Sequence, residues 1–464
     1  MHCTRFAAPA LVAGALLTTT LATLPGRAHA ADDHAAHENA VDENPAPPNI
    51  LFIWADNLGY GDLGLYGSER VKTPVIDRLA ADGMRFEQFY VAHTVCSPSR
   101  AALLTGRQPF RTGVTDVLRP DSPTGLAADE ITIAEALREQ GYATCAIGKW
   151  HVGDQREYLP LAQGFDHYFG IPWSMDMRPT LLLRDNEIVE DLQGDKVNNI
   201  TERYVDETIE WIGKHREKPF FVYFNHTLPH PPINLPEEFR TPDRPIYDDA
   251  IEQIDRQTGR LLDALRKMGL EKNTLVIFTS DNGPMHADGS AGKLRGRIRD
   301  AYEGGVRVPF VARWPGRIAR GGVVDSPAIM YDVFPTLVDL AGAELPDDRI
   351  YDGRSLRALL LGEALDAVRR RDPFVWVYDD NVTALRDGRW KLHIASRDKT
   401  LAKPELYDLE RDPGESRSIA EEHPDVARKL TAYAEEFQKQ VPKVWTLKYP
   451  VRDPAKRPSG VRRE

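Results

Sequence analysis

ILFIWADN, residues 50–57, is an apolar run that ends directly in an acid and an amide. The run shows no alternation of apolar and polar residues, which is typical of a strand buried on both faces. Parallel sheets with helices on both faces contain such strands. The segment therefore predicts an inner strand of a parallel sheet, with Asp56 and Asn57 at its carboxyl end.

Three further apolar runs also end in polar side chains. They are Tyr142–Ile147 before Gly148-Lys149-Trp150-His151, Phe220–Phe224 before Asn225-His226 and Pro229-His230-Pro231, and Leu275–Thr279 before Ser280-Asp281-Asn282-Gly283. In open α/β sheets, ligands bind outside the carboxyl ends of the strands. We therefore expect one site to gather Asp56, Asn57, Lys149, His151, His230, Asp281 and Asn282.

Helices are predicted between these strands. Thr73-Pro74 starts one that runs to Ala81, and another covers residues 132–140. Longer amphipathic helices are expected over residues 199–214 and 247–268. This alternation implies an α/β fold with a mostly parallel central sheet flanked by helices.

A smaller unit is expected to follow. Strand-like runs occupy residues 374–378, 383–385 and 390–394, and Asp387-Gly388 between the last two is a hairpin signal. A helix is expected from Pro424 to Gln440. We therefore divide the chain into a main domain over residues 49–365 and a small α+β domain with an antiparallel sheet over residues 366–464.

The amino terminus has the pattern of a secretory signal peptide. Arg5 precedes an apolar stretch from Ala7 to Leu24, and Ala28-His29-Ala30 resembles a cleavage site. An uncleaved membrane anchor is the alternative, although threonines interrupt the stretch. We expect residues 1–30 to be removed, residues 31–48 to form a disordered leader, and the protein to be exported to the periplasm or secreted. No later segment is apolar for long enough to cross a bilayer, so stable membrane insertion is not expected.

The composition excludes several classes of protein. Of 464 residues, 42% are hydrophobic and 28% are charged, which is ordinary for a globular chain and unlike a disordered, collagen-like or coiled-coil one. The net charge is -11 and there is no basic run, so a nucleic-acid partner is not expected. Three cysteines are too few for a disulfide scaffold, although the sequence leaves a bridge between Cys96 and Cys145 open.

CSPSRAALLTGR, residues 96–107, predicts a helix. Pro98 suits its first turn, the alanines and leucines propagate it, and Gly106 ends it. Cys96 would then lie at the helix N-terminus, where free N–H groups favour negative charge. Taken alone, this placement indicates a thiolate of low pKa, with a small buried core residue as the alternative.

At these residues the sequence resembles the type I sulfatases of the alkaline-phosphatase-like superfamily. Their signature is C-x-P-S-R followed by x-x-x-L-T-G-R, and residues 96–107 match every fixed position. The resemblance covers nearly the whole mature chain, because further segments look like the family's blocks in the family's order. These are Leu58-Gly59-Tyr60-Gly61-Asp62, Gly148-Lys149-Trp150-His151, Pro229-His230-Pro231, Ser280-Asp281-Asn282-Gly283, Tyr302-Glu303-Gly304-Gly305, Arg386-Asp387-Gly388-Arg389-Trp390-Lys391 and Glu405-Leu406-Tyr407-Asp408-Leu409.

The resemblance implies an alkaline-phosphatase-like fold and a sulfuric ester hydrolase. In the family, a formylglycine-generating enzyme oxidises the signature cysteine, here Cys96, to formylglycine (3-oxoalanine). The aldehyde hydrates to a diol; one hydroxyl attacks sulfur, and the second is later deprotonated to expel sulfate. Both aryl sulfates and sulfated sugars fit the family as substrates.

The resemblance also implies one bound cation. By family match, Asp56, Asn57, Asp281, Asn282 and the modified Cys96 hold it. Hard oxygen ligands favour Ca²⁺, with Mg²⁺ as the alternative, over zinc. The family often has aspartate at position 57, so the amide predicts weaker binding rather than loss of the site. For each acid–amide pair, a capping or turn role is the structural alternative.

Four other residues match catalytic positions of the family. Arg100 and Lys149 match residues that hold the diol and its developing anion. His151 matches the residue that takes the proton when sulfate is expelled. His230 matches a residue that binds sulfate near the leaving oxygen. Lys149 and His230 are thus expected in both catalysis and substrate binding.

One departure from the family concerns a lysine. The family usually reads L-R-G-G-K-G before the Tyr-Glu-Gly-Gly block, whereas residues 294–299 read LRGRIR, with Ile298 at the lysine position. Isoleucine can neither bind sulfate nor protonate a leaving group. We expect Lys293 or Arg297 to bind substrate instead, with Arg299 as a further candidate. Arginine is too basic to be a useful proton donor, which shifts the leaving-group step onto His230.

Two alternative functions remain at this point. One is a phosphate or phosphonate monoester hydrolase with the same formylglycine and cation, because a fold does not fix which tetrahedral anion is cleaved. The other is a non-catalytic binder of sulfated glycans, which Asn57 and Ile298 motivate. The intact cysteine signature argues against a binder, because a binder does not need a modifiable cysteine.

Overall fold

A computed structural model describes residues 47–363, 372–396 and 399–442. The expected signal peptide lies outside these residues, as does the expected leader apart from Pro47 and Pro48. The expected domain boundary after residue 365 also lies outside them. No helix in the described ranges combines the length and apolar character needed to cross a bilayer.

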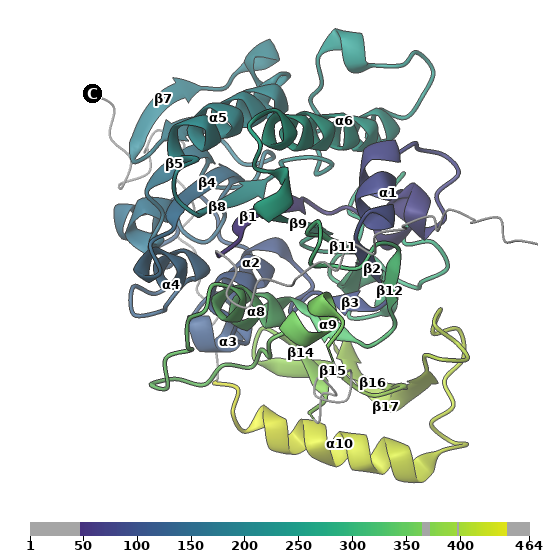
Figure 1. Ribbon diagram of the computed structural model, residues 1–464. Coiled ribbons are helices and arrows are strands. Elements are labelled where there is room, and N and C mark those ends of the chain that lie inside the picture. The colour runs from purple at the N-terminus through teal and green to yellow at the C-terminus, as the bar shows by residue number, and fades with distance from the viewer. Residues whose placement is uncertain (1–46, 364–371, 397–398, 443–464) are drawn as a thin grey trace, which may run out of the picture. The chain divides into compact units, whose positions relative to one another are not determined.

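The four predicted strands lie side by side at the centre of a large sheet (Figure 1). They are β1 (Asn49–Ala55), β4 (Ala143–Lys149), β8 (Phe220–Asn225) and β9 (Thr274–Ser280), in the order β9-β1-β8-β4. Neighbours in this group are parallel, and every residue of each strand is buried. The prediction of inner parallel strands is confirmed.

Antiparallel pairings complete the sheet at both ends. Beyond β4 lie the parallel β5 (His167–Ile171) and then β6 (Leu181–Arg184) and β7 (Glu187–Asp191), while beyond β9 lie β11 (Phe310–Arg313), β2 (Met84–Phe86) and β12 (Gly322–Val324). A separate small sheet contains β3 (Phe89–Tyr90), β10 (Arg307–Val308) and β13 (Ala328–Ile329). The sheet is therefore parallel where the site was expected and mixed towards its edges.

Helices cover both faces of the sheet (Figure 1). The four predicted helices are α1 (Pro74–Ala81), α4 (Ile133–Glu139), α5 (Ile200–His215) and α6 (Ile246–Lys267). Alternate residues of β1 divide between two cores. Leu51 and Ile53 pack with residues of α1, α5 and α6, whereas Phe52 and Trp54 pack with residues of α4 and of two further helices, α2 (Cys96–Thr105) and α8 (Val333–Leu340). The remaining helices are α3 (Pro109–Thr112), α7 (Glu303–Val306) and α9 (Arg357–Leu361).

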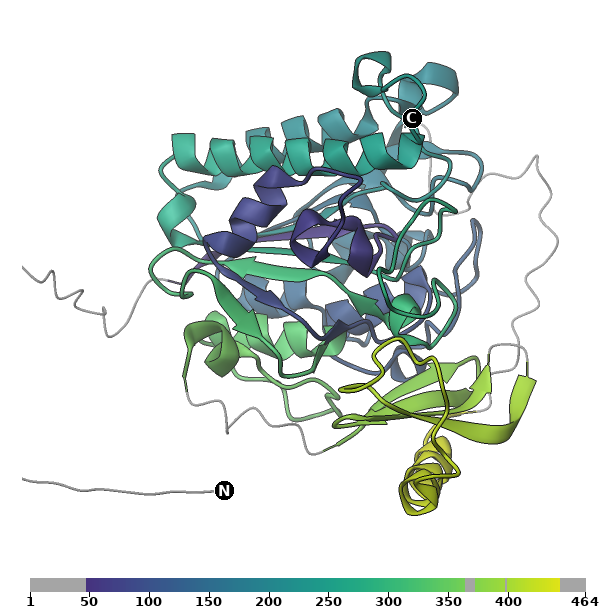
Figure 2. The ribbon, with the colours of Figure 1, turned by 90° about the vertical axis from the view of Figure 1, so that its right-hand side faces the viewer.

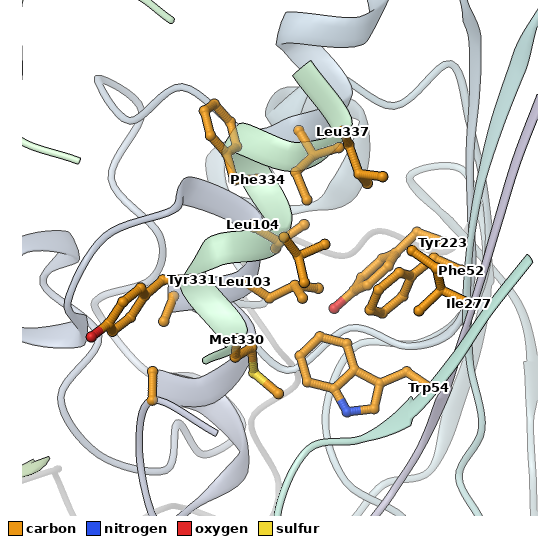
Figure 3. Packing of buried hydrophobic residues seen from close by; sticks show 14 of the residues in the cluster. Phe52, Trp54, Leu103, Leu104, Tyr223, Ile277, Met330, Tyr331, Phe334 and Leu337 are labelled. Atoms are coloured by element: carbon orange, nitrogen blue, oxygen red, sulfur yellow. The ribbon is translucent and has the colours of Figure 1, made fainter. Parts of the chain in front are cut away.

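Helix α2 is anchored in the second of these cores. Figure 3 shows Leu103 and Leu104 of α2 between the sheet side chains Phe52 and Trp54 and the α8 residue Phe334. All five side chains are fully buried. Burying a large apolar side chain contributes roughly 1.5–3 kcal/mol, so this packing fixes the helix that carries the cysteine signature.

The carboxyl-terminal unit is a four-stranded antiparallel sheet with one helix against it (Figure 2). Strands β14 (Phe374–Tyr378), β15 (Asn381–Asp387) and β16 (Trp390–Ser396) and helix α10 (Pro424–Gln438) confirm the predicted elements and the hairpin. The sequence did not predict the edge strand β17 (Lys399–Asp408). Its lysines and Pro404 are atypical of a strand, so the sequence pattern does not indicate one, although lysine and proline are both tolerated at a sheet edge.

A buried ion pair joins this sheet to the main domain. Lys391 Nζ lies 2.8 Å from Glu303 Oε1 and 3.4 Å from Glu415 Oε1, and all three side chains are fully buried. Burial alone would raise the pKa of Glu303, but the nearby cations hold it below its usual range. Because removing one partner of a buried pair costs about 3–5 kcal/mol, the two parts are coupled in stability.

A histidine between two acids predicts a pH-dependent contribution to stability. His167 Nδ1 lies 2.9 Å from Asp185 and Nε2 lies 2.8 Å from Glu207 of α5. Burial alone would lower the pKa of His167, but the hydrogen bonds to both acids raise it from 6.5 to about 9. The imidazolium should therefore stabilise the fold fully below pH 6.5, and this contribution should vanish as the pH rises through 9.

We expect His167→Gln to destabilise the protein at pH 6 by roughly 1–2 kcal/mol, after discounting for screening at the half-exposed Asp185. The difference in melting temperature between wild type and variant should shrink towards pH 10. A difference that stays constant between the two pH values would contradict the raised pKa.

Candidate active site

The polar residues predicted at the strand ends meet at one edge of the sheet. Residues Ala55 of β1 and Ser280 of β9 are register partners, so the residues that follow them are neighbours. The backbone N–H of Asn57 donates to Asp281 Oδ1 at 2.9 Å, and its Nδ2 donates to the same oxygen at 3.2 Å and to Asn282 Oδ1 at 3.3 Å. Three of the seven side chains expected to converge, those of Asn57, Asp281 and Asn282, are therefore in contact.

Two cations neutralise the two carboxylates of this cluster. Arg100 Nη2 lies 3.0 Å from Asp281 Oδ2 and 3.9 Å from Asp56 Oδ1, and Lys149 Nζ lies 2.7 Å from Asp56 Oδ2. All four side chains are fully buried. Burial, followed by the nearby Asp56 carboxylate, raises the pKa of Asp281 to about 6. Without a further ion, the charges of the cluster sum to zero.

Arg100 also fixes the ends of two strands. Its Nη1 donates to the Lys149 carbonyl at 2.9 Å and to Asn225 Oδ1 at 3.3 Å. Gly148 permits this arrangement, because a Cβ there would lie 1.7 Å from the Asn225 carbonyl oxygen and the residue has a left-handed φ of +89°. The glycine thus allows β4 and β8 to approach where Lys149 enters the site.

Cys96 is the first residue of α2, as predicted, and it is nearly fully buried. The charged groups that act on its thiol are Lys149, Asp281, Asp56 and Arg100, which places it at the cluster. The predicted thiolate of low pKa is wrong, because burial raises the pKa of Cys96 to about 11 and outweighs the cations. Cys96 and Cys145 are both free, so the bridge left open by the sequence does not form.

His151 presents an unpartnered nitrogen within the protein. Its Nε2 lies 2.9 Å from the Leu118 carbonyl oxygen, which can only accept a hydrogen bond. Nε2 therefore carries the proton, and Nδ1 carries a free lone pair. Nδ1 is buried without a hydrogen-bond partner. Burial, reinforced by Lys149 and Arg100, holds the pKa of His151 well below its usual range. His151 also has a φ of +64°, which is strained for a non-glycine residue and is found at functional sites.

His230 is connected to Lys149 through a serine. Lys149 Nζ donates to Ser174 Oγ at 3.2 Å, and Ser174 Oγ lies 3.3 Å from His230 Nε2. His230 Nδ1 donates to the Pro231 carbonyl, so Nε2 accepts from the serine hydroxyl. Burial and the charge of Lys149 lower the pKa of His230 to about 4. The three side chains form a hydrogen-bonded relay that leads from the cluster.

The donor set of the cluster fits a hard divalent cation. Asp56 Oδ1 and Asn57 Oδ1 are buried and accept no hydrogen bond, which is costly unless another group binds them. Asn282 Nδ2 donates to the His93 carbonyl at 3.0 Å, which leaves its Oδ1 on the Asn57 side. Over the described ranges, no group of three or more His, Cys, Asp or Glu is arranged to hold a metal. A cation here would thus need the amide oxygens, a set that suits Ca²⁺ or Mg²⁺.

The cations expected to replace the family's lysine do not join the cluster. Lys293 and Arg297 are exposed, and in the part of the chain that the structure describes neither side chain has a hydrogen bond or ion pair. Ile298 is partly buried, and its N–H lies 3.3 Å from the Pro284 carbonyl. The next residue, Arg299, donates its N–H to the Thr94 carbonyl at 2.9 Å, two residues before Cys96.

Sequence reasoning missed three residues of the site. Ser174 lies in the loop after β5, where no pattern marks it. Asn225 is the last residue of β8 and directly follows an apolar run. The same pattern predicted Asp56 as a site residue, so it could have identified Asn225 as well. His93 accepts the hydrogen bond of Asn282 through its backbone carbonyl. Any residue has this group, so the sequence gives no sign of the role.

The carboxyl ends of the parallel strands thus hold a buried set of two cations, two carboxylates and a helix N-terminal cysteine, an arrangement that suits an enzyme acting on esters of a tetrahedral oxyanion. A family model described as Sulfatase matches residues 48–343, and one described as N-sulphoglucosamine sulphohydrolase, C-terminal, matches residues 297–440. The chain belongs to the sulfatase family and is an enzyme that hydrolyses sulfate esters.

Known relatives and solved structures are similar to this chain over most of their own lengths. Arylsulfatase A of Bos taurus is 38% identical over 89% of this chain and 88% of its own length. N-acetylgalactosamine-6-sulfatase of Canis lupus familiaris is 33% identical over 85% of this chain and 86% of its own length. The crystal structure of Ps i-CgsB superposes with a TM-score of 0.77 at 29% identity, covering 86% of this chain and 94% of that one. The alkaline-phosphatase-like fold expected from the sequence is confirmed.

Proposed function

We propose that this sulfatase acts through a formylglycine made from Cys96, with one divalent cation, Ca²⁺ or alternatively Mg²⁺, at Asp56, Asn57, Asp281 and Asn282. The observation that carries the proposal is the position of Cys96 among Arg100, Lys149, Asp56 and Asp281. The four charged side chains have a net charge of zero. With a bound divalent ion, the net charge of the site would be plus two. Such a site attracts a sulfate monoester, and the cation would polarise the attacking and sulfate oxygens.

The proposed reaction has two covalent steps. The hydrated aldehyde attacks sulfur through one hydroxyl oxygen, the bond from sulfur to the ester oxygen breaks, and the alcohol leaves with a proton. The second hydroxyl then gives its proton to His151, the carbon–oxygen bond to sulfate breaks, and the aldehyde returns as sulfate departs. The buried free lone pair on His151 Nδ1 supports this role.

Lys149, Ser174 and His230 are proposed to serve the leaving group. The ammonium of Lys149 donates to Ser174, and the serine hydroxyl donates to His230 Nε2. For a proton to pass along this relay to the leaving oxygen, Lys149 must supply it and become neutral, so its charge against Asp56 returns only when the site is reprotonated. Arg100, held by two strand ends and by Asp281, is proposed to stabilise negative charge on the transferred group.

Maturation and location follow from the same proposal. A formylglycine-generating enzyme would be the partner that oxidises Cys96. The leader pattern over residues 1–30 supports export to the periplasm or secretion. Release of inorganic sulfate from the exported, modified protein is the expected activity.

The phosphate or phosphonate monoester hydrolase remains the alternative catalytic specificity. Parallel assays on 4-nitrophenyl sulfate and 4-nitrophenyl phosphate separate the two. We expect kcat/KM to be higher for the sulfate, because the chain belongs to the sulfatase family and the relatives it resembles are sulfatases. A higher value for the phosphate would overturn the proposed specificity.

Because Ile298 cannot donate a proton, the effect of substituting it is expected to depend on the leaving group of the substrate. A phenol leaves with little protonation, whereas a sugar alkoxide needs a proton donor, and general acid catalysis contributes ~10²–10⁴-fold. We expect Ile298→Lys to raise kcat on a sugar sulfate more than on 4-nitrophenyl sulfate. His230→Ala should lower kcat more on the sugar sulfate than on 4-nitrophenyl sulfate.

Ile298→Met is the matched control, since it lengthens the side chain without adding charge. Equal effects of Ile298→Lys on both substrates would show that this position does not govern proton delivery.

A further inference from the structure

Arg299 has a backbone conformation that arginine rarely adopts. Its φ is +76°, in the left-handed region that favours glycine. Non-glycine residues in this region are strained and persist where the surrounding structure holds them. Here the Arg299 N–H donates to the Thr94 carbonyl at 2.9 Å, which ties the strained residue to the segment that leads into Cys96.

The guanidinium of Arg299 is unused by the protein. Over residues 47–363, 372–396 and 399–442 it makes no hydrogen bond or ion pair, and it is only partly exposed. The nearby Arg295 differs, because it stacks on Tyr302 at 3.8 Å and donates to Tyr407 Oη at 3.1 Å. Among the described residues, Arg299 thus combines a strained backbone with a guanidinium that has no protein partner.

A small cavity adjoins this arginine. Its volume is about 30 Å³, and its lining includes Thr94, Arg299, Asp300, Tyr302 and Tyr378. The hydroxyl of the lining residue Thr94 is buried and has no hydrogen-bond partner. Other polar groups of the lining are engaged: Tyr302 Oη donates to Glu405 at 2.8 Å, and Asp300 Oδ2 accepts from the Arg297 N–H at 3.0 Å.

We infer that this cavity binds an oxyanion, a carboxylate or a second sulfate, carried by the alcohol part of the substrate. The inference rests on the proposed function and names its substrate class as acidic sulfated sugars. Arginine pairs well with such groups, and a hydroxyl donor beside it completes the recognition. A cavity needs about 10–15 Å³ to hold one water, so this one has room for two oxygen atoms, either both oxygens of a carboxylate or two of the oxygens of a sulfate.

The position of the cavity fits a group on the leaving sugar. Thr94 is two residues from Cys96, and two residues span at most about 7 Å. Asp300 also lines the cavity, and its carboxylate opposes an anion. The binding of the anion therefore depends on Arg299, which makes this residue a determinant of specificity.

The test compares three sugar sulfates with 4-nitrophenyl sulfate. One is a neutral hexosamine 6-sulfate, the second is the same sugar linked to a uronate, and the third is the same sugar with a second sulfate. The uronate and disulfate arms separate the two sources of the oxyanion. We expect the wild-type enzyme to have a higher kcat/KM for at least one charged sugar than for the neutral one.

Arg299→Gly removes the charge and relieves the backbone strain. We expect its melting temperature to be no lower than that of the wild type, while the ratio of kcat/KM between the charged and neutral sugars falls at least about tenfold. Arg299→Lys should retain part of the ratio, and the near-isosteric Thr94→Val should lower it. Arg297→Gly is the matched control, because it removes an exposed charge from the same loop, and it should change the ratio less than about twofold.

Two results would overturn the inference. One is an equal loss on all substrates in Arg299→Gly, and the other is a fall of the ratio by the same factor in Arg297→Gly. Failure of the proposed function has a different signature, because modified wild-type enzyme would then release no sulfate from 4-nitrophenyl sulfate either.

Discussion

Cys96→Ala is expected to lower kcat for sulfate release by at least about 10⁴-fold, because it removes the atom from which the nucleophile is made. The fold should survive, since the change removes one buried sulfur atom at the start of α2 and leaves the leucine packing of that helix intact. A melting temperature within a few degrees of the wild type, together with lost turnover, is the expected result. Sulfate release and thermal unfolding measure the two quantities.

Cys96→Ser is the matched control for the chemistry. A serine keeps one hydroxyl of nearly the same size but cannot form a diol, so it has no second hydroxyl with which to expel sulfate. We expect at most one turnover per molecule. Sustained turnover by Cys96→Ser would contradict the formylglycine mechanism and would indicate an ordinary hydroxyl nucleophile or another residue.

Removal of divalent cations with a chelator is expected to abolish most activity and to lower the melting temperature. A ligand that binds only the folded state stabilises it by about 2.7 kcal/mol at a hundred times its Kd. Ca²⁺ should restore both quantities, and Mg²⁺ should do so less completely. Full activity and an unchanged melting temperature after chelation would contradict the assignment of the four ligands.

Asn57→Asp is the sharper test of the cation site. Without a cation, the substitution removes the Nδ2 hydrogen bonds to Asp281 and Asn282 and sets one carboxylate against another. We therefore expect a lower melting temperature than the wild type in chelator. With Ca²⁺ the third carboxylate should bind the ion more tightly, so the gap between calcium-loaded and calcium-free protein should widen. A destabilisation that Ca²⁺ does not reverse would mean that Asn57 serves only as a hydrogen-bond donor.

The centre of the fold was predictable because its residues carry an unambiguous signal. An inner parallel strand is buried on both faces, so ILFIWA and its three counterparts are apolar without alternation. The carboxyl ends of such strands share one edge, which is why Asp56, Lys149 and Asp281 could be brought together from sequence alone. The antiparallel edges carry weaker patterns, and β17 was missed for that reason.

The electrostatics of the site could not be predicted in the same way. The helix N-terminus suggested a thiolate at Cys96, but desolvation depends on how completely other segments cover the thiol, and here it outweighs the nearby cations. The relay through Ser174 depends on the path of the loop after β5. The arginine of the proposed oxyanion cavity is a similar case, since the sequence favoured Lys293 and Arg297 as substrate-binding cations, whereas Arg299 lines the cavity and donates its N–H to the Thr94 carbonyl.

The most direct test of the account is mass spectrometry of the tryptic peptide Phe86–Arg100 from preparations with different degrees of maturation. Each preparation is also assayed for sulfate release per enzyme molecule. We predict that this peptide contains the aldehyde or its hydrate at Cys96 and that activity rises in proportion to the modified fraction. A fully active preparation in which the peptide contains only unmodified cysteine would contradict the account.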